Sequence, residues 1–420
     1  MAISKIILNG VTQMDVTDTT ATAPTVEAGL YFYGADGEKT LGTGSGGGTV
    51  EAVEKDVNFI DDYDGIIVYS YTATEFANLS ELPANPTHAG MTSQGWNWTL
   101  SDAKTYVAKY GKLWIGQQYI TTSGDTEIDI YLEKGRTSPY LGLAVNGSVS
   151  VDWGDGATPS TVTGTSLSTQ IRTLHNYPDE SAPYTIKISV VSGSFALYGS
   201  STYPVLSGDE STLSRNRVYA NSIQSIRMGT NVSLSSSACS YCSCMKSITL
   251  PSTISLTAGG FFSNCYNLKT MTIPTVTTGI GSSSFTSCYG LSYISIPKNI
   301  SAIGNTMFLN CYAFKNITIP STVTSIGTSS FSGCYLSSFT IPSEITSIGA
   351  SAFSNCYGLG EIHFTPSTPP TVTNSNTFNN LPTDCIIYVP YSADHSILND
   401  YKTESNYPDP NTYTYTEESA

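Results

Sequence analysis

The sequence has few charged residues and lacks a long apolar run. Charged residues make up 12% of the 420 residues, and Lys and Arg are outnumbered 18 to 33 by Asp and Glu, a net charge of 18 − 33 = −15. An acidic chain without a local Lys/Arg cluster repels phosphate backbones and anionic lipids, so we expect no nucleic acid and no membrane as partner. The apolar run Ile6 to Leu8 is too short for a signal peptide or an anchor.

The residue groups of common catalytic and metal sites are also scarce. The four histidines lie in unrelated segments, without a nucleophile motif or paired glutamates beside them: His88, His175, His363 and His395. A CxxC at Cys239 and Cys242 lacks the second pair that zinc spacing requires. The run Gly44 to Gly48 lacks the Lys and helix of a phosphate loop. We therefore expect no catalytic residue, no metal and no cofactor.

A fixed period of about 23 residues begins near residue 221. Three columns share this step and the same single deletion, which chance does not produce. They are Cys242, Cys265, Cys288, Cys311, Cys334 and Cys356; Pro251, Pro274, Pro297, Pro320 and Pro342; and Phe262, Phe285, Phe308, Phe331 and Phe353. The first turns are degenerate, since Cys239 stands in the Phe column and Thr257 in the Ile column.

One 23-residue unit cannot enclose a core, so successive units must stack as a solenoid. Each unit contains one short LxxIxI strand, which predicts a parallel sheet over an interior of Ile, Phe, Leu and Cys. We interpret the repeat cysteines as small apolar core residues rather than disulfides or metal ligands. The last turn needs a cap, because it would otherwise expose its apolar end and an unpaired strand edge.

These repeats resemble the BspA-like leucine-rich repeats of bacterial surface proteins over 221–364. The segment that begins TPSTPPTVTNSNTF is similar to the C-terminal cap of that family, which implies a cap and tail over 365–420. The predicted fold class is therefore mainly β and multidomain, with a leucine-rich-repeat solenoid at its C-terminal end.

Two smaller domains are expected before the solenoid. Over 49–124, VNFI and IIVYSY flank a DDYDG turn, which predicts a hairpin. Helices are predicted after Thr72, which forms a capping box with Glu75, and between Ser101–Asp102 and Gly111, with Trp96 and Trp98 as core anchors. This segment resembles the small β-grasp-like α+β repeats of internalin-type surface proteins.

Residues 125–220 contain short alternating strands and the turn VDWGDG. The turn and the following HNYPDESAPYTIKISV resemble a polycystic-kidney-disease (PKD) domain, which implies an immunoglobulin-like β-sandwich used as a spacer. Asp152 and Asp155 flank the turn, and we expect them to shape it. Calcium binding by the two carboxylates remains the alternative, although further acidic ligands are lacking.

Residues 1–48 contain a Thr-rich segment and end in a Gly-rich linker. Their opening residues are similar to the N-termini of structural proteins of tailed phages from gut bacteria. That resemblance implies that this segment docks on other virion proteins, while the distal modules face outward. It also implies assembly in the host cytoplasm, which would keep the cysteines reduced, and location in the virion.

The outer face of the solenoid sheet is the candidate ligand site, because its residues alternate with buried isoleucines. It comprises Thr270, Thr272, Tyr293, Ser295, Asn316, Thr318, Ser338, Thr340, Glu361 and His363. Beside it runs a tyrosine column of Tyr266, Tyr289, Tyr312, Tyr335 and Tyr357. Fixed hydroxyls and aromatic rings suit a glycan or a protein, but a solvated face with packing tyrosines explains the same pattern.

Three functions follow from these patterns. The leading hypothesis is a phage fibre, spike or decoration protein, expected to be a homo-oligomer such as a trimer, whose solenoid binds a host-surface glycan or protein. The alternative is a BspA-like adhesin on a bacterial surface, which should carry a secretion signal and an anchor. A glycan-cleaving enzyme needs two convergent carboxylates, for which the solenoid offers mainly Glu344 and Glu361. We therefore expect a non-enzymatic binding protein.

Overall fold

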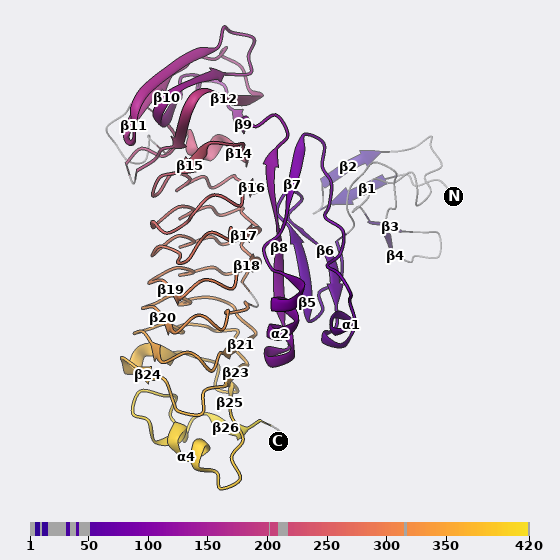
Figure 1. Cartoon of the computed structure of the whole chain (residues 1–420), viewed down its shortest axis with the longest axis vertical. Helices are drawn as coiled ribbons and strands as arrows, with labels where there is room; N and C mark the ends of the chain where they lie inside the picture. Colours follow the sequence, from indigo (N-terminus) through magenta and orange to yellow (C-terminus); the bar gives the residue numbers. More distant parts are fainter. Residues whose placement is uncertain are drawn as a thin grey trace.

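The computed structural model describes residues 5–8, 11–15, 31–33, 39–41, 51–200, 202–208, 217–314 and 317–418. The N-terminal segment contributes two antiparallel pairs, β1 (Lys5–Leu8) with β2 (Val11–Asp15) and β3 (Tyr31–Tyr33) with β4 (Lys39–Leu41). Most of residues 1–48, for which a docking role is predicted, lies outside the described residues, and so does the glycine run. Figure 1 shows a long solenoid with a smaller module along its side.

Residues 51–124 form the side module, an α+β unit with one four-stranded sheet. Its elements are β5 (Val57–Asp61), β6 (Ile66–Tyr71), α1 (Ala73–Ala77), β7 (Met91–Trp96), α2 (Leu100–Tyr110) and β8 (Leu113–Thr121). The strand order is β6-β5-β8-β7, and the central pair, β5 and β8, is parallel. This mixed sheet accords with the predicted α+β unit.

The local signals in this module act as the sequence predicts. Gly65, at a φ of 70°, closes the hairpin between β5 and β6. Thr72 and Glu75 form the capping box of α1. Gly111 ends α2 in the left-handed conformation, but Thr99 rather than Ser101 caps its N-terminus, because the Thr99 hydroxyl accepts the Asp102 amide.

Residues 125–208 form long antiparallel strands at the N-terminal end of the solenoid. These are β9 (Thr126–Leu132), β10 (Tyr140–Asp152), β11 (Ser160–Leu174), β12 (Ala182–Leu197) and the short β13 (Leu206–Ser207). They belong to an eight-stranded sheet of order β11-β10-β12-β9-β14-β16, whose last two strands are already solenoid strands. The sandwich expected over 125–220 is therefore continuous with the solenoid, since β9 pairs with β14 and one apolar core spans both.

The WGDG turn has the shape-determining role that we predicted for its aspartates. Asp152 accepts the Gly154 amide and Asp155 the Ala157 amide, each at 3.0 Å. The second Asp155 oxygen pairs with His175 at 2.8 Å, and the His175 ring stacks on the buried Trp153.

The solenoid contains two series of short parallel strands. One series comprises β14 (Ile223–Arg227), β16 (Ser247–Thr249), β17 (Thr270–Thr272), β18 (Tyr293–Ser295), β21 (Ser338–Ile341), β23 (Glu361–Phe364), β25 (Ile386–Val389) and β26 (Thr414–Glu417). The other comprises β19 (Ala302–Ile303), β20 (Ser325–Ile326), β22 (Ser347–Ile348) and β24 (Thr371–Val372). A further short strand, β15 (Val232–Leu234), pairs with β12. The predicted parallel solenoid is confirmed.

The repeat columns fill the interior. Phe285, Phe308 and Phe331 are fully buried and stack at centroid distances of 5.4 to 5.6 Å. The repeat cysteines are buried as well, and each thiol from Cys265 onward bonds a carbonyl of the preceding turn, as Cys311 does with Phe285 at 3.1 Å. The prediction of a cysteine core column is confirmed by this burial.

Residues 365–418 close the C-terminal end of the solenoid. Strands β25 and β26 extend the sheet, and helix α4 (Ser396–Thr403) places Tyr401 against the last turn. Tyr401 is fully buried, and its hydroxyl donates to the Pro366 carbonyl at 2.7 Å. Among the described helices, none is both long and apolar enough to cross a membrane.

Candidate functional site

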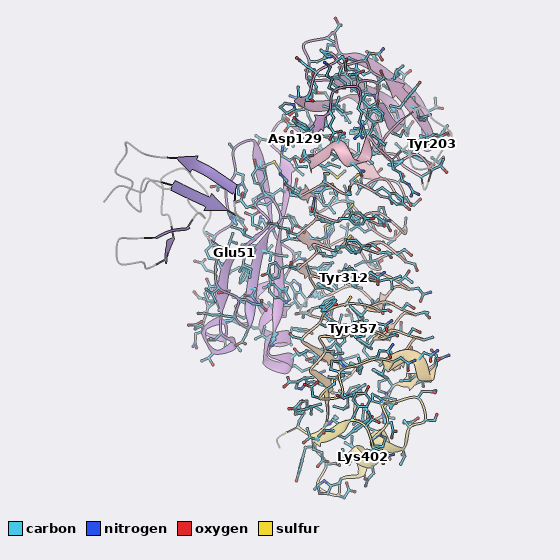
Figure 2. The ribbon with its side chains drawn as sticks, turned by 180° about the vertical axis from the view of Figure 1, so that it is seen from behind. Glu51, Asp129, Tyr203, Tyr312, Tyr357 and Lys402 are labelled. Atoms are coloured by element: carbon cyan, nitrogen blue, oxygen red, sulfur yellow. The ribbon has the colours of Figure 1, made fainter. Side chains whose placement is uncertain are left out.

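The side module lies against the solenoid face that the sequence marks as the candidate ligand site (Figures 1 and 2). Strand β8 contacts β16, β17 and β18, and β5 contacts β17. Trp114 of β8 is buried and packs against Tyr293 of β18 at a centroid distance of 4.8 Å. The middle turns of the solenoid are therefore covered by residues from earlier in the same chain.

Side chains of the module bond to carbonyls of three successive turns. Asn97 donates to the Ile273 carbonyl at 3.2 Å, and the indole of Trp98 donates to that of Ile296 at 2.9 Å. The Tyr106 hydroxyl donates to the Ile319 carbonyl at 2.6 Å. These three isoleucines each precede a repeat proline and are 23 residues apart. The module thus follows the repeat of the solenoid.

The hairpin of the module also inserts a carboxyl into this contact. The Thr272 amide donates to Asp62 at 2.5 Å, while the other Asp62 oxygen is buried without a hydrogen-bond partner. Burial raises the pKa of Asp62 to about 7. Close by, Gly116 allows β8 to approach Thr272, because an added Cβ would lie 2.0 Å from its hydroxyl oxygen.

This contact corrects part of the predicted ligand face. Thr270, Thr272 and Ser295 are buried beneath the module, Tyr293 is half-buried, and Thr318 is buried at its lower border. In this structure Thr270, Thr272, Tyr293 and Ser295 are not on an open surface, because the face they form binds another part of the chain, whereas Thr318 lies where that face opens. Asn316 lies outside the described residues.

A chemical difference along the face could have indicated which strands the module covers. The outer positions of β17 and β18 are uncharged residues, whereas β23 carries Glu361 and His363. Burying an uncharged hydroxyl costs less free energy than burying a charged group, so an uncharged stretch suits a covered face. Strand alternation applies equally to every turn and does not register this contrast. The outer positions of β21, Ser338 and Thr340, are uncharged as well but line the open pocket, so the contrast marks only part of the cover.

Beyond the module, the face opens into a pocket of about 540 Å³. One wall comes from the module and the other from the solenoid. The lining residues are Tyr106, Lys109, Tyr110, Lys112, Trp114, Ile317, Thr318, Ile319, Ser338, Thr340, Glu361, His363, Thr365 and Glu418. Five of the ten predicted positions thus come together here: Thr318, Ser338, Thr340, Glu361 and His363.

The module wall of the pocket is fixed by an ion pair at its rim. Lys109 pairs with Glu344 at 2.7 Å, and the Tyr110 hydroxyl donates to the same carboxylate at 2.7 Å. These hydrogen bonds lower the pKa of Glu344, although burial acts in the opposite direction. Both oxygens of Glu344 are thus engaged by the module.

The solenoid wall carries an imidazole between two carboxylates. His363 bonds Glu418 at 2.6 Å and Glu361 at 3.2 Å, and its ring stacks on Tyr388 at 4.4 Å. The side chains of Glu361 and Glu418 are partly exposed, so both carboxylates are open to a ligand. Together with the hydroxyls of Ser338 and Thr340, this wall presents mainly hydrogen-bonding groups.

The tyrosine column forms an exposed ladder. Tyr266 and Tyr289 stack in parallel at 4.6 Å, and Tyr289 and Tyr312 at 4.9 Å. Parallel stacking makes neighbouring rings cover each other's faces, which leaves mainly edges and hydroxyls accessible. These three tyrosines are therefore a poorer platform for a stacked sugar than their exposure suggests, whereas Tyr335 meets Tyr312 edge to face.

Comparison with known proteins identifies the repeats. A family model for the BspA type leucine rich repeat region matches in six copies, over residues 194–292 and 278–401. The chain thus carries BspA-type leucine-rich repeats, as predicted. The match starts at residue 194, before the expected start at 221, and runs to 401, past the expected end at 364. No protein with a curated description is similar to the chain.

Three solved structures are similar to parts of the chain. They are a leucine rich cell surface protein of Faecalibacterium prausnitzii (22% identity, 41% of this chain and 57% of that one, TM-score 0.25), a leucine-rich repeat protein of Bacteroides ovatus (17%, 47% and 75%, 0.24) and the pneumococcal vaccine antigen PcpA (15%, 45% and 66%, 0.23). The chain spans just over half the length of the first of these. At such TM-scores the repeat assignment depends on the family match.

Proposed function

We propose that this protein is a non-catalytic binding protein that holds a hydroxyl-rich ligand, a glycan, in the pocket between α2 and the solenoid strands. The observation that carries the proposal is the convergence of five predicted face residues with a second wall from the side module. A pocket built from two modules has a defined depth and orientation, which an open repeat surface lacks.

The lining chemistry favours a glycan over an apolar ligand. Ser338, Thr340 and Thr365 offer hydroxyls, and Glu361 and Glu418 offer carboxylates that accept hydrogen bonds from sugar hydroxyls. Tyr110 adds a half-buried ring at the rim. Lys112 is exposed and makes no ion pair with a described residue, so it is available to an acidic sugar as well.

A glycan array probed with the full chain tests this proposal, followed by titration of the strongest hit. Glu361→Gln and Thr340→Val should each weaken binding about tenfold, because each removes one hydrogen bond to the ligand. Thr371→Val is the matched control, since Thr371 is exposed on β24 in the other strand series. If all three variants bind the glycan with the affinity of the wild type, this pocket is ruled out as the binding site.

The biological setting of the binding protein is a finer proposal. The resemblance of residues 1–48 to phage structural proteins supports a virion fibre, spike or decoration protein, attached to other virion proteins by its N-terminus and assembled as a trimer. The repeat match supports equally the alternative of a BspA-like adhesin on a bacterial surface. In both settings the solenoid module is the part that binds the target surface.

Mass spectrometry and cryo-electron microscopy of purified phage particles from the source distinguish the two settings. A virion protein should be present in particles, with residues 1–48 at the particle and the solenoid outward. Absence from particles, together with the protein on the bacterial surface, would overturn the virion proposal and leave the adhesin.

A further inference from the structure

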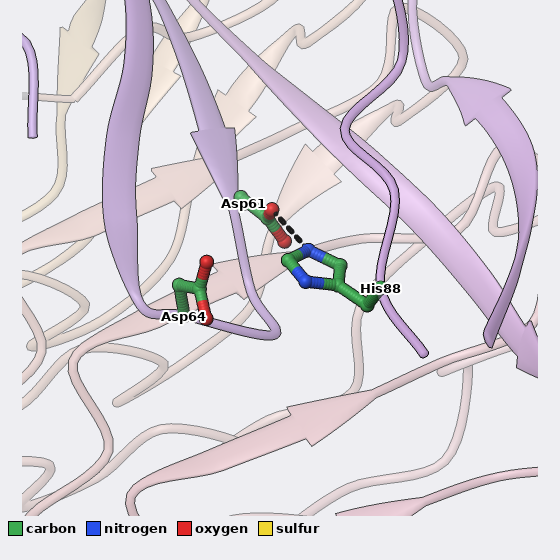
Figure 3. Close-up of side chains that lie close together, drawn as sticks. All are labelled: Asp61, Asp64 and His88. Atoms are coloured by element: carbon green, nitrogen blue, oxygen red, sulfur yellow. Dashed lines mark hydrogen bonds and ion pairs between the residues drawn. The ribbon is translucent and has the colours of Figure 1, made fainter. Parts of the chain in front are cut away.

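The DDYDG hairpin of the side module brings a histidine and two aspartates together (Figure 3). Asp61 ends β5, Asp64 lies in the turn, and His88 precedes β7. Carboxylate oxygens of the two aspartates and a ring nitrogen of His88 all lie within 4.8 Å of one another. The cluster thus joins one turn to a histidine that is 27 residues from Asp61 along the chain.

The geometry of the cluster is fixed by its neighbours. One Asp61 oxygen accepts the Tyr63 amide at 3.0 Å, and the other pairs with the Nε2 atom of His88 at 2.7 Å. The ring of Tyr63 stacks on that of His88 at 4.1 Å. The side chains of Asp61 and His88 are 0% and 7% exposed. Two of the three groups are therefore held in place and shielded from water.

A buried hydroxyl adjoins the same cluster. Tyr119 of β8 is 1% exposed, and its hydroxyl has no hydrogen-bond partner of normal geometry. Its ring meets that of His88 edge to face at 5.4 Å. Burial, followed by the charge of Asp61, raises the pKa of Tyr119. A buried, unsatisfied oxygen is costly unless a further group completes the site.

We propose that Asp61, Asp64 and His88 form a zinc site, with the ring of the buried Tyr119 packed against His88. Imidazole nitrogen and carboxylate oxygen are both zinc ligands, at bond lengths of about 2.0–2.2 Å. Tetrahedral zinc holds its ligand atoms about 3.3 Å apart, and Asp64 is exposed in the turn, so a small movement of its side chain closes the set. Calcium prefers six or more oxygens, which the cluster lacks.

Zinc in this site stiffens the hairpin that docks on the solenoid. Asp62, the next residue after the ligand Asp61, accepts the Thr272 amide of β17. Cross-linking the turn to His88 holds this residue in its docked position. The site is independent of the proposed glycan pocket, whose lining residues do not include any of the three ligands.

Isothermal titration of the chelator-treated full chain with zinc chloride, with the thiols kept reduced, tests the site. One zinc ion should bind per chain, and zinc should raise the thermal unfolding temperature. Asp64→Asn should weaken zinc binding by about tenfold or more. Because Asp64 is exposed, this variant should keep the fold of the apo protein. His88→Gln should have the same effect on affinity.

Asp152→Asn is the matched control, because Asp152 lies beside a second histidine–aspartate pair, Asp155 with His175, and its own oxygen is used by the WGDG turn. Zinc binding by this variant should equal that of the wild type. The proposal is overturned if the wild type binds no zinc, if it binds calcium but not zinc, or if Asp64→Asn binds zinc as the wild type does.

Discussion

The turns that carry β17 and β18 and those that carry β21 and β23 repeat one sequence pattern, yet their outer positions face different surroundings. On the first pair, Thr270, Thr272 and Ser295 are buried under the side module. On the second pair, Ser338, Thr340, Glu361 and His363 line an open pocket. The repeat determines the shape of the face, but a non-repetitive module determines which part of it a ligand reaches.

The largest effect on the docking of the side module over β17 and β18 should come from pH, through the titration of Asp62. Because burial raises the pKa of Asp62 from 3.8 to about 7 in the docked state, docking favours its protonated form. The free energy of docking should weaken by at most about 4 kcal/mol as the pH rises from about 4 to 7, and it should stay constant at higher pH. Urea unfolding with chelator present checks this, since three of the four tryptophans, Trp96, Trp98 and Trp114, lie in the module.

The Asp62→Asn variant isolates this effect, because its side chain does not titrate. Its unfolding free energy should lack the decline between pH 4 and 7, whereas Asp152→Asn should keep it. Parallel pH profiles of the wild type and Asp62→Asn would show that Asp62 does not control docking.

A smaller effect is expected from Gly116→Ala. The new methyl group would meet the Thr272 side chain at 2.0 Å, and relieving such overpacking costs about 1–3 kcal/mol. Hydrogen exchange should increase in β17 and β18 but not in β21 and β23. Gly279→Ala, where the added Cβ has open space, should leave all four strands unchanged. An increase in all four strands would instead indicate loss of the solenoid itself.

Tyr106→Phe should cost about 1–2 kcal/mol, because it leaves the buried Ile319 carbonyl without its donor. Urea unfolding measures the loss. Tyr131→Phe provides the control, since Tyr131 is exposed and its loss of a hydroxyl should change stability little. A Tyr106→Phe variant as stable as the control would mean that water replaces the hydroxyl at this border.

The smallest effect should come from Lys109→Met at the rim of the pocket. Its ion pair with Glu344 is partly exposed, and such pairs contribute roughly 0–1 kcal/mol. A double-mutant cycle with Glu344→Gln, at low and high salt, isolates the pair energy. A coupling energy that does not fall with salt would argue against an electrostatic origin.

The periodic part of the fold could be predicted from the sequence, because each turn repeats the same spacing of apolar residues. The Phe and Cys columns identified the interior, and the alternation along each strand identified the outer face. The pairing of β9 with β14 was not predictable in this way, since the repeat encodes contacts between turns and not those of its first strand with another module. The expected separate sandwich therefore appeared as an extension of the solenoid.

Half of the candidate site could also be predicted. Positions such as Thr340 and His363 follow from the repeat, whereas the opposite wall depends on Tyr106 and Tyr110, which contact the solenoid across more than 200 residues of sequence. Neither tyrosine belongs to a periodic pattern. The zinc site escaped prediction for the same reason, because Asp61 and His88 are 27 residues apart and only the folded hairpin joins them.

The three bonds from Asn97, Trp98 and Tyr106 to successive turns have a mechanical consequence. A solenoid bends or stretches by changing the spacing between its turns, much as a coil spring does. Where one rigid module is fastened to three turns, that spacing is fixed and the rod is stiff. The contacts of Lys109 and Tyr110 with Glu344 extend the fastening to the next turn. A pull on a bound ligand should therefore bend the turns beyond Glu344 before it bends the turns beneath the module.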